Sequence, residues 1–177
     1  MLITLKHAHA IFAAVTKHMD THMSYISDGF RKRILLLDID DTALITTVSL
    51  KHLYRQYVTY KIYQHALASG VPVVFLTARR HSCFSYLWTL HQLHSLGYTR
   101  IQKLLLMPRS FRSVSAFKSH VRGRIGKQNI LVNMGDQWGD FFCPVPVDEH
   151  LHRRNAHVHL FVDPKTSHTL NVKLPSV

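Results

Sequence analysis

The stretch Ile34-Leu35-Leu36-Leu37-Asp38-Ile39-Asp40-Asp41-Thr42 decides how this chain of 177 residues folds. Four consecutive apolar residues are typical of a strand that is buried on both faces of a parallel sheet, and three carboxylates follow almost at once. Open α/β sheets bind their ligands at the carboxyl ends of the strands. The stretch therefore predicts a central parallel strand that leads into a functional site.

A second acidic cluster, Gly135-Asp136-Gln137-Trp138-Gly139-Asp140, follows another strand-like run at residues 130–133. The chain has only ten Asp and Glu against 22 Lys and Arg, and five of the ten lie in these two clusters. Negative charge gathered at two strand ends is costly unless a cation compensates it, and a divalent metal is the simplest cation. The two clusters predict a metal-assisted active site.

Strands and helices alternate along the rest of the chain. This alternation indicates right-handed crossovers and a three-layer, doubly wound parallel α/β sheet in a single domain, residues 1–177, with residues 1–30 as a helical segment packed on the core. We expect further strands at residues 71–76, 104–106, 130–133 and 157–162, with 169–174 pairing beside the last, and helices at 50–67, 83–96 and 113–123.

Four motifs, in order, resemble those of the haloacid dehalogenase (HAD) superfamily of aspartyl-nucleophile phosphatases. The stretch 38–42 is similar to its DxDxT signature, Phe75-Leu76-Thr77-Ala78-Arg79 to the threonine-bearing second motif, and residues 116–122 to the lysine-bearing third. The cluster at 135–140 has the GDQWxD form of class III (B-type) acid phosphatases and vegetative storage proteins. The resemblance implies a HAD-like Rossmannoid fold and phosphatase activity.

The spacing of the motifs bears on access to the site. About 34 residues separate Thr42 from Thr77, which is enough for one helix but too few for an inserted cap domain. We therefore expect a capless enzyme with an open site. The second motif reads Thr-Ala-Arg where the family usually has Thr-Gly-Arg, so the methyl group of Ala78 crowds the expected phosphate loop.

Phosphoryl transfer needs a nucleophile, an acid for the leaving oxygen and neutralisation of the phosphoryl charge. Asp38 is the predicted nucleophile, Asp40 the predicted acid and base, and Lys118 the fixed positive charge. The resemblance implies that Asp136 binds Mg²⁺ together with Asp38 and the Asp40 main-chain carbonyl. Asp140 then completes the surroundings of the metal or orients Lys118.

Several residues have a second interpretation that the sequence leaves open. Thr77, Ala78 and Arg79 are predicted to bind the phosphate, but Thr77 could instead cap the following helix. Arg79 and Arg122 are equally compatible with phosphate clamps and with surface charges. The remaining open cases are Asp41 and Asp140 as plain turn residues, Lys127 as a rival of Lys118, Trp138 as a packing anchor, and His150, His152, His157 and His159 as an exposed patch or a metal site.

Composition limits the partners and the compartment. The formal charge of +12 favours anionic partners: a phosphorylated small molecule, a nucleotide or a nucleic acid. The sequence contains no run of about 18 uncharged apolar residues, so it predicts no membrane span. The N-terminal stretch is interrupted by Lys6, His7 and His9, which favours a packing helix over a signal peptide. Cys83 and Cys143 form no CxxC pair, so reduced thiols and a cytoplasmic location are expected, with secretion left open.

The sequence therefore predicts a Mg²⁺-dependent phosphomonoester hydrolase that acts through an aspartyl-phosphate. Two alternatives stay open: a catalytically weak storage or binding protein on the same fold, and a phosphatase acting on nucleotides or nucleic-acid ends. The oligomeric state is not predicted.

Overall fold

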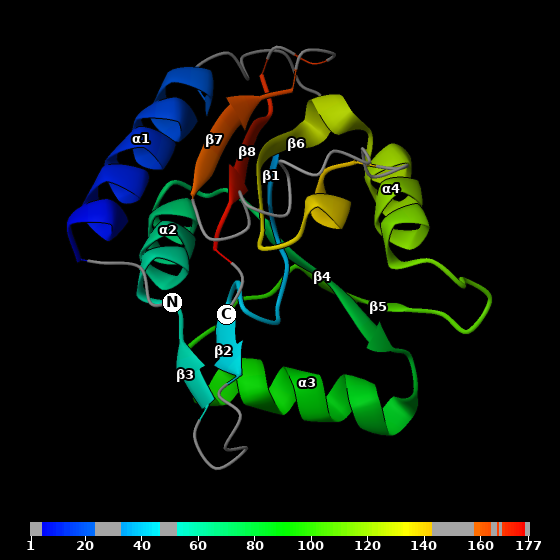
Figure 1. Ribbon diagram of the computed structural model, residues 1–177. Helices are drawn as coiled ribbons and strands as arrows, with labels where there is room; N and C mark the ends of the chain where they lie inside the picture. Colours follow the sequence, from blue (N-terminus) through cyan, green and yellow to red (C-terminus); the bar gives the residue numbers. More distant parts are fainter. Residues whose placement is uncertain are drawn as a thin grey trace.

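The computed structural model describes residues 5–23, 33–46, 53–142, 158–163, 166 and 168–175. A six-stranded sheet lies between helices, and a small two-stranded sheet stands beside its lower end in Figure 1. In chain order the elements are α1 (Leu5–Met23), β1 (Ile34–Leu37), β2 (Leu44–Thr46), β3 (Leu53–Arg55), α2 (Tyr57–Ala68), β4 (Val73–Arg80), α3 (Cys83–Ser95), β5 (Lys103–Met107), α4 (Val114–Ile125), β6 (Ile130–Gly135), β7 (His159–Val162) and β8 (Leu170–Lys173), with short 3₁₀ turns at Lys127–Asn129 and Trp138–Asp140.

The strands of the main sheet run in the order β5-β4-β1-β6-β8-β7. All neighbours pair in parallel except β7, which runs antiparallel to β8 at the edge. From β1 the chain steps outward to β4 and β5, then returns through α4 to β6 on the other side. The direction of winding therefore changes between β1 and β6, the place where doubly wound sheets assemble their sites. The predicted α/β fold is confirmed, with one antiparallel strand added.

The central strands are buried on both faces, which is why their sequence shows an apolar run rather than alternation. Leu35 and Leu37 belong to the apolar core that α1, α2 and α3 cover, and Leu36 belongs to the core under α4. Helix α1 adds Ala8, Ile11, Val15 and Met19 to the first core. The N-terminal helix therefore packs on the sheet as expected, and Figure 1 shows α1 and α2 on one side and α4 on the other.

The helix expected at residues 50–67 is wrong in its first part. Helix α2 begins only at Tyr57, and Leu53 lies in β3, which pairs antiparallel with β2. The three- and four-residue spacing of apolar residues continued by chance through a strand, and the Gln56 N–H donates to the Ala43 carbonyl at 3.0 Å instead of entering a helix. Leu50 lies outside the described residues. The hairpin is thereby fixed beside the first acidic cluster.

Strand β4 is longer than expected, because pairing with β5 continues as far as Arg80. Thr77, Ala78 and Arg79 therefore stand at the end of a strand. The helix ends agree well with the sequence: Gly70 and Gly97 follow α2 and α3 with φ of 71° and 93°, conformations that glycine adopts without cost. No helix in the described part of the chain is long and apolar enough to cross a membrane.

Candidate active site

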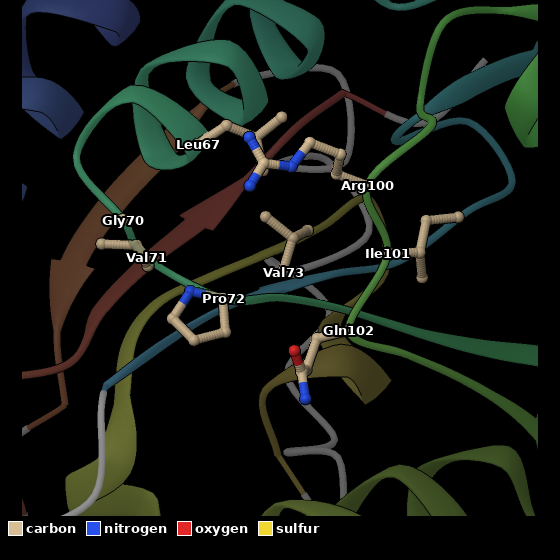
Figure 2. A pocket seen from close by; sticks show the side chains of 8 residues that line it. All are labelled: Leu67, Gly70, Val71, Pro72, Val73, Arg100, Ile101 and Gln102. Atoms are coloured by element: carbon tan, nitrogen blue, oxygen red, sulfur yellow. The ribbon is translucent and has the colours of Figure 1, made fainter.

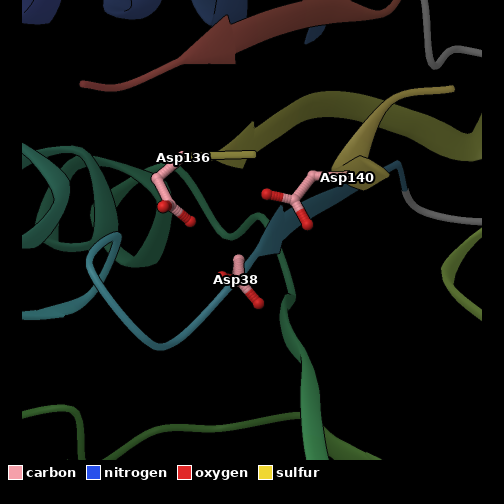
Figure 3. A group of neighbouring side chains, drawn as sticks. All are labelled: Asp38, Asp136 and Asp140. Atoms are coloured by element: carbon pink, nitrogen blue, oxygen red, sulfur yellow. The ribbon is translucent and has the colours of Figure 1, made fainter. Parts of the chain in front are cut away.

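The two acidic clusters meet at the carboxyl edge of the sheet. Strands β1 and β6 are neighbours, and the Asp38 N–H donates to the Met134 carbonyl at 2.9 Å. Asp38, Asp136 and Asp140 are all buried, and each offers a carboxylate oxygen within 4.8 Å of the others. Figure 3 shows the three side chains converging from the ends of β1 and β6 and from the turn after β6. Residues about 100 positions apart in the sequence thus form one acidic cluster.

Lys118 enters this cluster from α4. Its Nζ donates to Asp38 Oδ1 at 2.6 Å and to Asp140 Oδ1, and its side chain is only 4% exposed. Burial by itself would lower the pKa of Lys118, but Asp38 and Asp140 raise it above its usual value. Lys118 is therefore a protonated ammonium. Its rival Lys127 approaches Asp163 instead, at 3.8 Å.

The carboxylates carry more negative charge than this ammonium offsets. Burial, and then the nearby Asp140, raise the pKa of Asp38 well above its ordinary value despite the opposing effect of Lys118. Burial and Asp140 likewise raise the pKa of Asp136 to about 6, although Gln137 Nε2 donates to Asp136 Oδ2 at 2.7 Å. The raised pKa values mean that burial and the neighbouring carboxylates disfavour the charged forms of Asp38 and Asp136. A bound metal ion would stabilise those charged forms, so a metal ion suits the cluster.

The turn after β6 is built around Asp140. Its Oδ2 accepts from the Gln137 N–H at 3.0 Å, and the Gln137 side chain accepts in return from the Asp140 N–H. A Cβ on Gly135 would lie 2.2 Å from Asp140 Oδ2, so only glycine leaves room for this carboxylate. The Asp140 main-chain carbonyl accepts from Arg122 and from Asn133 Nδ2. Asp140 also accepts from Lys118, the contact expected if it orients this lysine, and its role at the metal stays a prediction.

Arg122 is not a solvated surface charge. It is 4% exposed, and its guanidinium donates to the Asp140 main-chain carbonyl. The alternative of a phosphate clamp stays a prediction. Arg122 and Asn133 together fix the turn that carries Asp140 to α4 and β6.

Asp40 leaves the sheet in a tight turn. The N–H groups of residues 42, 43 and 44 all donate to the Ile39 carbonyl, and Asp41 takes a φ of 56°, which Asp tolerates better than most residues. The Asp40 carboxylate does not join the acidic cluster: it pairs with Arg79, with Nη2 to Oδ1 at 2.7 Å and Nε to Oδ2 at 3.0 Å. Its main-chain carbonyl, the atom expected to bind the metal, stays a prediction.

The second motif is local to β4. Thr77 is fully buried, and its hydroxyl oxygen accepts from the Arg79 N–H at 3.2 Å. The alternative that Thr77 caps the next helix is wrong, because Ser82 does so, accepting from the Ser85 N–H at 3.0 Å. Arg79 is not a solvated surface charge, because its guanidinium donates to Asp40, Thr89 and Gln92. Its expected role in phosphate binding stays a prediction.

Sequence reasoning missed several polar residues around the site. Asn133, Thr89 and Gln92 are buried. Asn133 and Thr89 each interrupt an otherwise apolar run, a signal that could have marked them, whereas Gln92 follows His91 and carries no such signal. Lys173 at the end of β8 is also buried, and burial lowers the pKa of its ammonium while Asp136 and Asp140 oppose that shift. Its Nζ lies 5.6 Å from the centre of the Trp138 ring, which packs with Phe141, Phe142 and Phe161 as the anchor that the sequence predicted.

Two other expectations are only partly covered by the structure. Cys83 is an exposed free thiol, and Cys143 lies outside the described residues. His150, His152 and His157 also lie outside them, and His159 packs at 5.4 Å from the Trp138 ring. A metal site in that histidine-rich stretch therefore stays untested.

The structure also has a pocket that lies away from the acidic clusters. Figure 2 shows it at the entry of β4, the amino edge of the sheet, whereas the acidic side chains stand at the carboxyl edge. Its lining is Leu67, Gly70, Val71, Pro72, Val73, Arg100, Ile101 and Gln102. With no carboxylate, thiol or histidine among these residues, the chemistry is better placed at the acidic edge.

Comparison with known proteins shows the family of this chain. Residues 51–156 match the family model of the HAD superfamily, subfamily IIIB (acid phosphatase), which spans the second to fourth motifs. No curated protein matches the chain. Among solved structures, the class C acid phosphatase from Bacillus anthracis is similar, with a TM-score of 0.58 and 16% identity. The match covers 78% of this chain and 66% of that one, less than two thirds of its length, and at this identity it concerns the fold alone.

Proposed function

Because this chain belongs to the acid phosphatases of HAD subfamily IIIB, we propose that it hydrolyses phosphomonoesters through an aspartyl-phosphate on Asp38. One observation carries the proposal: a buried ammonium, Lys118, bridges Asp38 and Asp140 at the carboxyl edge of the sheet. A carboxylate that is to attack an anionic phosphate needs such a fixed positive charge beside it.

The proposed reaction has two halves. In the first, a carboxylate oxygen of Asp38 attacks phosphorus, the bond to the ester oxygen breaks, and that oxygen takes a proton from Asp40. In the second, a water oxygen attacks the same phosphorus and gives its proton to Asp40 while the bond to Asp38 breaks. Inorganic phosphate leaves, and both carboxyl groups return to their starting states.

The acidic cluster fits a divalent metal, and we propose Mg²⁺. Asp38, Asp136 and the main-chain carbonyl of Asp40 would hold it, with Asp140 close by, since Mg²⁺ prefers oxygen ligands. Bound there, the ion would neutralise charge on the phosphoryl oxygens. The raised pKa of Asp136 supports this assignment, because burial and the nearby Asp140 disfavour its charged form and a bound cation would favour it.

In this proposal, groups at the end of β4 bind the phosphate. The Thr77 hydroxyl and the main-chain N–H groups near Ala78 would contact the phosphoryl oxygens. Arg79, expected to share this task, has its guanidinium engaged by Asp40.

A second candidate substrate is a nucleic-acid end. Arg80 at the end of β4 and His81 after it are exposed, as are Arg109 and Arg112 after β5, and the ends of these two strands lie side by side. A positive surface beside the phosphate position suits a substrate whose further phosphates extend from the reacting one. Affinity for a 5′- or 3′-phosphorylated oligonucleotide that falls steeply with salt would favour this substrate over a small ester.

The decisive experiment compares wild type with Asp38→Asn on an aryl phosphate, in Mg²⁺ and in EDTA. We expect hydrolysis by wild type in Mg²⁺, none in EDTA, and a loss on the order of a thousandfold or more in the variant. Equally poor hydrolysis by both proteins would instead favour the storage or binding protein. Full activity in EDTA would refute the metal assignment.

A further inference from the structure

All three guanidinium nitrogens of Arg79 donate to side chains of the protein. Its Nε and Nη2 form a two-point pair with the Asp40 carboxylate. Its Nη1 donates to two side chains of α3, to Thr89 Oγ1 at 3.1 Å and to Gln92 Oε1 at 2.6 Å. One edge of the planar guanidinium therefore faces Asp40, and another faces the helix.

The burial of these groups is graded from the helix to the solvent. Thr89 and Gln92 are buried, the Arg79 side chain is 19% exposed, and the Asp40 side chain is 41% exposed. A short carboxylate side chain at that exposure would otherwise be free to change rotamer. The anchored guanidinium removes this freedom, because it is itself held at two points that solvent does not reach.

The chemistry of the anchors matters as well. Thr89 and Gln92 are neutral acceptors, so they orient the guanidinium without competing for its charge, which is left to Asp40. Phosphate binding through the same edge would require Arg79 to abandon the carboxylate. The contacts thus favour a partner for Asp40 over a clamp for the substrate.

We propose that Arg79, anchored on α3 by Thr89 and Gln92, is a positioning residue that aims the Asp40 carboxylate at the oxygen it serves. The inference rests on the proposed function, in which Asp40 gives a proton to the ester oxygen and later takes one from water. Helix α3, which contributes no reacting group in that proposal, thereby becomes part of the active site.

The test measures kcat for an alkyl and an aryl phosphate, together with inhibition by inorganic phosphate. The proteins compared are wild type, the single variants Arg79→Met, Arg79→Lys, Gln92→Leu and Asp40→Asn, and the double variant Arg79→Met/Asp40→Asn. An alkyl oxygen needs a proton to leave, whereas an aryl oxygen scarcely does. For Arg79→Met we expect kcat to fall about a hundredfold with the alkyl ester and less than about tenfold with the aryl ester. The inhibition constant of phosphate should change less than about threefold, because Arg79 does not hold the phosphate.

The other variants make the result specific. Arg79→Lys should recover little, since an ammonium cannot form the two-point pair. Gln92 is remote from the reacting atoms, so Gln92→Leu should show a smaller loss of the same kind. We expect its kcat with the alkyl ester to fall about tenfold, a tenth of the fall expected for Arg79→Met. The double variant Arg79→Met/Asp40→Asn should be no slower than Asp40→Asn alone, because Arg79 acts only through Asp40.

Three outcomes would overturn the inference. A large rise in the phosphate inhibition constant with kcat unchanged would make Arg79 a phosphate clamp. Equal losses with both esters would make its role merely structural, and additive losses in the double variant would separate it from Asp40. A wild type inactive toward both esters would instead overturn the proposed function, and the positioning role with it.

Discussion

Replacing Lys118 by methionine should destabilise the protein strongly. Methionine is also long and unbranched, so the cavity is filled, but Asp38 and Asp140 lose the ammonium that both contact. Removing one partner of a buried ion pair typically costs about 3–5 kcal/mol, because the remaining charge is left uncompensated in a medium of low dielectric. Because two carboxylates lose their partner, we expect the free energy of unfolding to fall by an amount near the upper end of this range, about 5 kcal/mol at pH 8.

The loss should shrink in acid. Burial already raises the pKa of Asp38, and removing Lys118 takes away the effect that opposes this shift. A carboxyl group whose pKa is raised by folding binds its proton more tightly in the folded state, so stability increases as the pH falls. The difference between variant and wild type should therefore be smaller at pH 5 than at pH 8.

The assay is urea unfolding in EDTA at both pH values, with Lys127→Met as the matched control. The Lys127 side chain is 42% exposed and lies 3.8 Å from Asp163, so its loss should cost less than about 1 kcal/mol. If Lys118→Met were no less stable than Lys127→Met, or if its deficit were the same at both pH values, the assignment of Lys118 as the buried counter-charge would be refuted.

The other predictions concern the metal and the turn after β6. Folding raises the pKa of Asp136 to about 6, so protons compete with the metal below that pH. Calorimetry should show Mg²⁺ affinity falling about tenfold per pH unit below 6 and levelling off above it. If the affinity did not change between pH 5 and pH 8, Asp136 would be excluded as a ligand. In EDTA the same shift should make stability fall as the pH rises from about 4 to 6. Gly135→Ala places a methyl group 2.2 Å from Asp140 Oδ2 and should cost about 1–3 kcal/mol with loss of activity. Gly123→Ala in α4 meets nothing within 4 Å and should be neutral or stabilising by up to about 1 kcal/mol in the same unfolding assay.

The strands and the acidic edge could be predicted because their signals are local. The apolar run at residues 34–37 and the carboxylates after it describe a buried strand and its exit within nine residues. The same holds for the run at 130–133 and for the helix ended by Gly97. Since parallel strands share one edge for their carboxyl ends, Asp38 and Asp136 were expected to meet before any contact was known.

The hairpin of β2 and β3 shows where local reasoning fails. The same spacing of apolar residues fits a long helix and also fits a strand residue, Leu53, followed by a shorter helix. Only the pairing of β3 with Leu44–Thr46 decides between the two. Arg79 shows the same limit for side chains. Its sequence position allowed a phosphate clamp or a surface charge, and the structure gives it Asp40, 39 positions away, and Gln92, 13 positions away.

The sequence by itself determined the order of the helices and of the strands of the main sheet, the edge where the acidic residues gather, and the family. Periodicity, turn chemistry and motif spacing are local properties of the chain, which is why these features could be predicted. Only the tertiary structure decided which charged groups pair: Lys118 with Asp38 and Asp140, Arg122 with the Asp140 main chain, and Arg79 with Asp40. The physical reason is burial. Once a charged group is removed from water it must find a partner within a few ångströms, and packing of distant elements, which no local pattern records, determines which partner is there.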